Sequence, residues 1–161
     1  MTVREDDVLF PNNHKGIYGV VEKDDFVLIV PFDGIHFILV KQYRYPIKQY
    51  SWEFPQGKHE DGSHIDPEKL AKLELKEETG VTAKSIKKIG FFHEAPGYAN
   101  QGFSLFLAQG LDFKKQALED TEDIQYGKFT VTQFENMILN SEITDAPTIS
   151  AFGLLKVKKI I

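Results

Sequence analysis

The chain has 161 residues, 42% of them hydrophobic, and a formal net charge of −5, which fits one globular domain with a buried core. Its 19 basic residues are scattered and it has no cysteine, so we expect neither a nucleic-acid-binding surface nor a disulfide or thiolate metal site. No apolar run could span a bilayer, and the acidic start lacks the apolar segment of a signal peptide. We therefore expect a cytoplasmic protein without a membrane or nucleic-acid partner.

Strands are predicted where short runs of β-branched and aromatic residues are bounded by Gly, Pro or Asp. These segments are Gly16–Val21, Phe26–Pro31, Phe37–Tyr43, Trp52–Phe54, Ile86–Phe92, Phe103–Ala108 and Ile124–Thr130. Helices are predicted at Pro67–Thr79, at about Gln133–Asn140, and from near Pro147, with Asp145 or Ala146 just before it, to about Val157. Because strands and helices do not alternate regularly, we expect an α/β or α+β sandwich with a mixed sheet flanked by helices.

The helix over Pro67–Thr79 has clear signals at both ends. Asp66 can accept hydrogen bonds from the free N–H groups of the first turn, and proline suits the first helical position. Gly80 can adopt the left-handed conformation that ends a helix. For the second helix, Thr132 and Glu135 have the spacing of a capping box.

The first helix carries its glutamates on an unexpected face. On a wheel of roughly 100° per residue, the neighbours within about 60° of Glu74 are Leu70, Ala71, Glu77 and Glu78. The opposite face holds Lys69, Lys72 and Lys76. The glutamates therefore lie within the apolar stripe, which inverts the usual amphipathic pattern.

Carboxylates turned toward a packed interior cost free energy unless charge or hydrogen bonds compensate them. A bound Mg²⁺ or Mn²⁺ would do so, because both cations prefer hard oxygen ligands. The wheel thus predicts a metal site formed by Glu74, Glu77 and Glu78. The alternative, a solvated charged helix face, remains open, although the lysines already occupy the opposite side.

The same segment resembles the signature of the Nudix hydrolases, G-x5-E-x7-R-E-U-x-E-E-x-G-U, in which U is apolar. The residues that match its second half are Glu74, Leu75, Glu77, Glu78, Gly80 and Val81. Gly57, in WEFPQGK, matches the opening glycine. Other segments resemble the ADP-ribose pyrophosphatase branch of the family, namely KQYRYP, APGYANQ and SEITDAPTISAFGLL.

The resemblance implies a fold, an activity and a partner. The fold would be a Nudix-type α/β/α sandwich, with residues 1–161 as a single domain and residues 1–30 as a short N-terminal strand region. The activity would be metal-dependent hydrolysis of the pyrophosphate bond of ADP-ribose or a related nucleoside diphosphate sugar. The resemblance also implies a homodimer, since this branch usually pairs through its N-terminal strands.

Site residues follow from the same resemblance. Mg²⁺ or Mn²⁺ would be held by the backbone carbonyl of Gln56 with Glu74, Glu77 and Glu78, and Glu122 in LEDTEDIQ best matches a further catalytic carboxylate of the branch. A solvated acidic loop is the alternative for Glu122. Substrate contacts would come from Arg44, Glu53, Tyr98 and Gln101. A guanidinium suits phosphate because it donates in a fork and keeps its charge, although a surface salt bridge is the alternative for Arg44.

The sequence also departs from the family pattern. The interval from Gly57 to Glu74 is two residues longer than the signature allows, and no acidic residue matches its first glutamate. Leu73 stands where the family has the arginine that orients a catalytic glutamate, and Gln101 stands where this branch often has a glutamate. These departures favour a second hypothesis, a catalytically weak or inactive Nudix-fold module that binds or senses a nucleotide.

Overall fold

The computed structural model describes residues 1–59, 65–114, 116 and 123–161. The strands are β1 Thr2–Leu9, β2 Lys15–Glu22, β3 Phe26–Pro31, β4 His36–Arg44, β5 Gln49–Glu53, β6 Gln56–Gly57, β7 Val81–His93, β8 Gly102–Phe113 and β9 Gln125–Thr130. The helices are α1 Pro67–Thr79, α2 Val131–Leu139 and α3 Ala146–Val157, and a short 3-10 turn, η1, covers Tyr45–Ile47. None of the helices in these described ranges is long and apolar enough to span a membrane.

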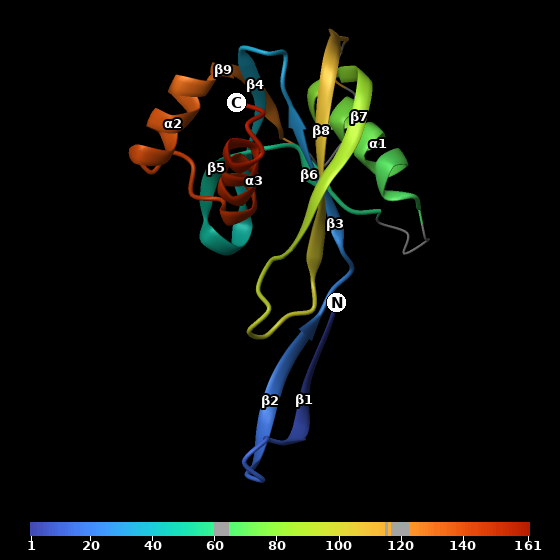
Figure 1. The fold of residues 1–161 in the computed structure, drawn as a ribbon, viewed down its shortest axis with the longest axis vertical. Coiled ribbons are helices and arrows are strands. Elements are labelled where there is room, and N and C mark those ends of the chain that lie inside the picture. Colours follow the sequence, from blue (N-terminus) through green and yellow to red (C-terminus); the bar gives the residue numbers. More distant parts are fainter. Residues whose placement is uncertain (60–64, 115, 117–122) are drawn as a thin grey trace.

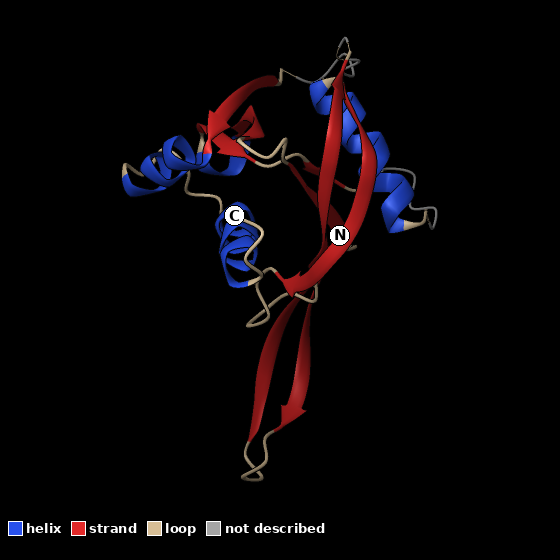
Figure 2. Ribbon diagram, turned by 45° about the horizontal axis from the view of Figure 1, so that its top comes forward, coloured by secondary structure: helices blue, strands red, loops and turns tan. Residues whose placement is uncertain are grey.

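The strands form three sheets, ordered β1-β2, β6-β3-β8-β7 and β5-β4-β9. The pairing of β3 with β8 is parallel, whereas β8 pairs with β7 antiparallel, so the central sheet is mixed. In Figures 1 and 2, α1 lies on one side of this sheet and α2 and α3 lie on the other. The predicted sandwich of helices around a mixed sheet is confirmed.

Alternation along β3 divides the core into two parts, because successive side chains of a strand point to opposite faces. Val27 and Ile29 pack with the apolar side chains of α1. Leu28 and Val30 pack on the other face with an aromatic cluster that includes Phe37 and side chains of α2 and α3. Burial on both faces explains why β3 is an uninterrupted apolar run.

The ends of the helices follow local side-chain hydrogen bonds. Asp66 accepts from two N–H groups at the start of α1, and Gly80 ends that helix with φ +69°, as the sequence predicts. The predicted capping box of α2 is wrong by two residues: Thr130 is the N-cap, and its partner is Gln133. Asp145 is the N-cap of α3, where its carboxylate accepts from Thr148 N–H at 2.9 Å.

The first strand, β1, was not among the predicted segments. It pairs along its whole length with β2, and the resulting hairpin projects from the body of the molecule (Figure 1). The base of this hairpin is attached to the loop between β7 and β8. Val21 N–H donates to the carbonyl of Tyr98 at 2.8 Å, and the Tyr18 hydroxyl donates to the carbonyl of Gly97 at 2.8 Å.

A buried hydrogen bond connects α3 to the segment between β5 and β6. Thr148 is fully buried, and its hydroxyl accepts from Phe54 N–H at 3.0 Å. Because Phe54 lies between Glu53 and the strand β6, this contact fixes the position of two residues with predicted functional roles, Glu53 and Gln56.

Candidate active site

Helix α1 presents its glutamates to the interior to different degrees. Glu78 is 4% exposed, whereas Glu74 and Glu77 are partly buried. The residues of α1 that are buried beside Glu78 are Leu70, Ala71, Leu75 and Thr79. The three lysines Lys69, Lys72 and Lys76 are exposed, so the carboxylates and the ammonium groups lie on different faces of the helix.

The short strand β6 runs against this carboxylate face. Gln56 N–H donates to Glu78 Oε2 at 3.0 Å, which compensates part of the cost of burying that carboxylate. The backbone at the end of α1 is also held, because the side-chain amide of Gln116 donates to the Glu78 carbonyl at 2.5 Å. Glu78 is therefore fixed at both its side chain and its main chain.

Gly57, the next residue of β6, allows a second close approach. A Cβ atom built on Gly57 would overlap the carboxylate of Glu74. The absence of a side chain at position 57 is thus what lets the Glu74 carboxylate lie directly against the strand. The opening glycine of the signature has a steric role here.

The donor set of this region suits a divalent cation in its chemistry, because carboxylate oxygens next to a main-chain strand are the ligands that Mg²⁺ and Mn²⁺ prefer. In the described part of the chain, however, no three acidic or histidine side chains converge into a ligand group. Glu77 lies on the same face of α1 as Glu74 and Glu78 and is partly buried. Glu122, the predicted further carboxylate, lies outside the described residues.

Arg44 and Glu53 form a forked ion pair between β4 and β5. The guanidinium donates from Nε at 3.0 and 3.1 Å and from an Nη at 2.5 Å to the two oxygens of Glu53. The side-chain amide of Gln56 donates to the same carboxylate at 2.6 Å. Glu53 is 2% exposed, so these donors provide the compensation that a buried charge requires.

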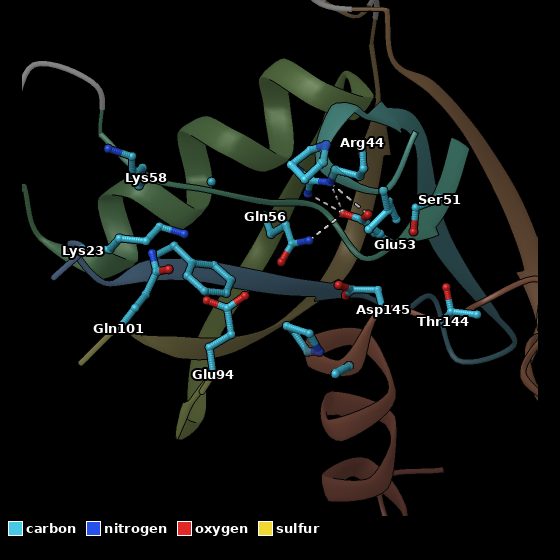
Figure 3. A pocket seen from close by; sticks show the side chains of 16 residues that line it. Lys23, Arg44, Ser51, Glu53, Gln56, Lys58, Glu94, Gln101, Thr144 and Asp145 are labelled. Carbon is cyan, nitrogen blue, oxygen red and sulfur yellow. Dashed lines mark hydrogen bonds and ion pairs between the residues drawn. The ribbon is translucent and has the colours of Figure 1, made fainter. Parts of the chain in front are cut away.

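A cavity of about 520 Å³ opens beside this ion pair. The charged residues that line it are Lys23, Arg44, Glu53, Lys58, Glu94 and Asp145. Gln56 and Gly57 line it as well, so β6 separates the cavity from the carboxylates of α1. Figure 3 shows the two lysines at one end of the cavity, and Arg44, Glu53 and Asp145 at the other.

The charges at the Arg44 end influence one another. Burial disfavours the charged guanidinium, but the hydrogen bonds to Glu53 and the negative charges of Glu53, Asp145 and Glu78 outweigh it and raise the pKa of Arg44 above its usual value. Burial, reinforced by the negative charge of Glu53, raises the pKa of the Asp145 carboxyl despite its hydrogen bonds to Thr148. The sequence indicated only that Asp145 or Ala146 precedes the third helix.

Gln101 lines the cavity near Lys23. It is 3% exposed, and its Nε2 donates to the carbonyl of Asp24 at 2.6 Å. Its Oε1 is buried and has no hydrogen-bond partner among the residues that the structure describes. A buried acceptor without a donor is costly, so this oxygen favours a ligand that offers an N–H or O–H group.

Two residues that the sequence analysis singled out, Tyr98 and Leu73, are not among the residues that line the cavity. Tyr98 is 59% exposed and lies in the loop between β7 and β8, outside the residues that line the cavity. Leu73, at the arginine position of the signature, is 46% exposed. A longer side chain at position 73 would therefore have access to solvent.

The comparisons with known proteins agree with this geometry. A model of the NUDIX domain family matches residues 23–152. The chain belongs to the Nudix family. The sequence is 33% identical over 159 residues to an ADP-ribose pyrophosphatase of Bacillus subtilis (strain 168), and the match covers 97% of this chain and 85% of that protein.

A methanol dehydrogenase activator of Bacillus methanolicus is 29% identical over 159 residues, with the same coverage of 97% and 85%. A crystal structure of an ADP compounds hydrolase superimposes with a TM-score of 0.80 at 21% identity, covering 96% of this chain and 91% of that one. The resemblance to the ADP-ribose pyrophosphatase-like branch is thus confirmed, as is the assignment to the Nudix pyrophosphohydrolases.

Replacing Gly57 by alanine tests the contact between β6 and α1. The new methyl group would displace the Glu74 carboxylate, so we expect a loss of about 1–3 kcal/mol in the free energy of unfolding and a weaker stabilisation by Mg²⁺. Chemical denaturation with and without Mg²⁺ measures both. Gly97→Ala is the matched control, because a Cβ at Gly97 meets open space. Equal behaviour of the two variants would contradict the steric role of Gly57.

Metal titration tests the carboxylate site itself. If Glu74 and Glu78 hold a cation, Mg²⁺ or Mn²⁺ should raise the melting temperature, corresponding to about 2.7 kcal/mol at a hundredfold excess over Kd. Glu78→Gln should lose this increase. Leu73→Arg restores the arginine that the Nudix signature has at this position, and we expect it to raise metal affinity or activity. A wild-type melting temperature that does not change with metal would refute the site.

Proposed function

We propose that this chain hydrolyses the pyrophosphate bond of ADP-ribose or a related nucleoside diphosphate sugar, using Mg²⁺ or Mn²⁺. The observation that carries the proposal is the position of β6. On one side, Gln56 and Gly57 contact the carboxylates of Glu78 and Glu74. On the other side, the same two residues line the cavity, so a bound diphosphate would lie against β6, with the carboxylates of α1 directly behind this strand.

The chemistry of the cavity supports a nucleotide-linked ligand. Lys23 and Lys58 place ammonium groups at one end, where they can attract phosphate oxygens. The buried Oε1 of Gln101 has no hydrogen-bond donor among the described residues. A sugar hydroxyl or a base amino group of a ligand can donate to it. The cavity volume of about 520 Å³ is within the range usual for small-molecule sites.

The residues proposed to hold the cation are Glu74, Glu77 and Glu78, with the backbone carbonyl of Gln56. A bound divalent cation would neutralise phosphate charge and make water more acidic. The protein's own part is to keep Glu78 oriented through Gln56 N–H and to hold Glu74 against Gly57. Glu122 stays a prediction as the further catalytic carboxylate.

The substrate residues divide into two groups. Arg44 and Glu53 already satisfy one another, so we propose that they act together, as a rigid wall of the cavity. Gln101 acts individually through its free acceptor. Tyr98 remains a proposed substrate contact without a place in the cavity of this structure.

Leu73 is the observation behind the second hypothesis, a nucleotide-binding module with little hydrolysis. Its exposed position on α1 provides no guanidinium to hold a catalytic glutamate. Tight binding of ADP-ribose without turnover in the assay below would favour that hypothesis.

The proposal extends to assembly and organisation. Exposed apolar side chains on the β1–β2 hairpin, including Val3, Leu9 and Ile17, support a homodimer that covers them. We further propose that residues 1–161 form a single domain in which residues 1–30 are an N-terminal strand region. A cytoplasmic location and the absence of a nucleic-acid partner stay predictions from the sequence.

Product analysis tests the activity. With Mg²⁺ or Mn²⁺ present, the wild-type protein should release AMP from ADP-ribose, and Glu78→Gln should lower kcat by about a hundredfold. Glu68→Gln is the matched control, since Glu68 is exposed on the same helix and pairs with Lys72. No turnover of any nucleoside diphosphate sugar with either cation would refute the proposal.

Analytical ultracentrifugation tests the dimer. At micromolar concentration the wild-type chain should sediment as a dimer, and Ile17→Lys should shift it toward monomer, because a charge would replace an apolar contact on the hairpin. Ile35→Lys is the control. Ile35 is also exposed but lies between β3 and β4, so this change should leave the dimer intact. A wild-type monomer would rule the proposal out.

A further inference from the structure

Asp145 occupies a position in the cavity that its role as a helix cap does not explain. Its Oδ2 accepts from Thr148 N–H at 2.9 Å, while the carboxylate borders the cavity beside Glu53 (Figure 3). Asparagine or serine would cap α3 equally well. The negative charge also interacts favourably with the N-terminal end of α3, and in this position it additionally brings a carboxylate to the cavity.

The balance of charge at this end makes that carboxylate significant. Among the described residues that line the cavity, Arg44 is the cation at this end, and its guanidinium donates three hydrogen bonds to Glu53. Asp145 is thus a second carboxylate beside a guanidinium already paired with the first. Burial is the largest cost to the charge of Asp145 and repulsion from Glu53 adds to it, while the hydrogen bonds from Thr148 and the charge of Arg44 offset only part of this cost.

The other end of the cavity has the opposite character. Lys23, Lys58 and Glu94 lie there with Gln101, so this end carries two ammonium groups and one carboxylate. The buried Oε1 of Gln101 has no partner among the described residues. This unsatisfied acceptor indicates independently that a ligand belongs in the cavity. A diphosphate is attracted to the lysine end, and the remainder of the ligand extends toward Asp145.

We propose that Asp145 is a specificity-determining residue that admits a neutral, hydrogen-bond-donating group of the substrate at the Arg44–Glu53 end and rejects substrates that carry an additional phosphate there. The inference rests on the proposed hydrolysis of nucleoside diphosphate sugars and adds a selection rule to it. A sugar hydroxyl or base amino group can donate to the carboxylate, whereas a phosphate can only bring like charge to it.

The repulsion is effective because the carboxylate cannot move away. Thr148, which holds Asp145, is itself fixed by the hydrogen bond from Phe54 N–H at 3.0 Å and is fully buried. Arg44 cannot turn to a phosphate without leaving the buried carboxylate of Glu53 with the Gln56 amide but no positive charge beside it. The end of the cavity therefore keeps its negative character when a ligand enters.

The test compares ADP-ribose with two analogues, one phosphorylated on the adenosine ribose and one on the terminal ribose. For wild type, Asp145→Asn and Glu142→Gln, kcat/KM is measured for each compound, and Kd is measured by calorimetry without metal. Asparagine retains the helix cap. Glu142→Gln removes the same charge from an exposed position three residues earlier, outside the cavity.

For one of the two analogues, we expect Asp145→Asn to raise the ratio of its kcat/KM to that of ADP-ribose by about tenfold. The ratio of its Kd to that of ADP-ribose should fall by a similar factor. Glu142→Gln should leave the ratios at their wild-type values. The analogue that responds identifies which ribose lies beside Asp145. A purely structural role would change stability without changing these ratios.

Unchanged ratios for both analogues in Asp145→Asn would overturn the inference, as would equal changes in Glu142→Gln. The Kd ratios separate this result from a failure of the proposed activity. If wild type binds ADP-ribose without hydrolysing it, the hydrolysis proposal fails and the Kd ratios still decide the role of Asp145. If no compound binds, both proposals are wrong.

Discussion

The contact between helix α1 and strand β6 is the constraint on which the rest of the site depends. Two carboxylates on one helix must lie against a main-chain segment without a side chain between them. Gly57 makes this possible for Glu74, and Gln56 N–H compensates the charge of Glu78. A strand of only two residues therefore lies between the acidic helix and a cavity that has lysines at one end and the carboxylates of Glu53 and Asp145 at the other.

The position of β6 is fixed by contacts with residues that precede it and residues that follow it in the sequence. Toward the N-terminus, Glu53 is held by Arg44 and by the side chain of Gln56. On the C-terminal side, the Thr148 hydroxyl of α3 accepts a hydrogen bond from Phe54 N–H. Few of these contacts are close in sequence, so the precision of the site comes from tertiary structure.

This division explains what could be predicted from the sequence. The ends of α1 were predicted correctly because Asp66 and Gly80 act on their immediate neighbours. The start of α2 was not, because Thr130 with Gln133 and Thr132 with Glu135 both satisfy the capping-box pattern. Local spacing cannot choose between them; the end of β9 at Thr130 does. Likewise, the mixture of charged and apolar residues in β1 gave no strand signal before its partner β2 was known.

The same holds for the site residues. A helical wheel predicts that Glu78 points toward the interior, because the direction of a side chain on a helix depends only on the helical period. It cannot show that Arg44 and Glu53 neutralise each other, or that Asp145 borders a cavity, because these depend on strands and helices far apart in the chain. Gln101 could be identified by its place in a motif, but its unsatisfied oxygen required the geometry.

The parallel pairing of β3 with β8 has a consequence for how the protein is made. Phe26 pairs with Phe103, so strand β8 must leave the ribosome before the central sheet can close. The support for β6 comes later still, from Thr148 in the last helix. Long-range pairings of this kind fold slowly, and chains emerge N-terminal end first. A nascent chain therefore exposes its acidic helix well before the cavity exists, and competence for ligand binding arises only after Thr148 and the α3 residues that line the cavity have been synthesised.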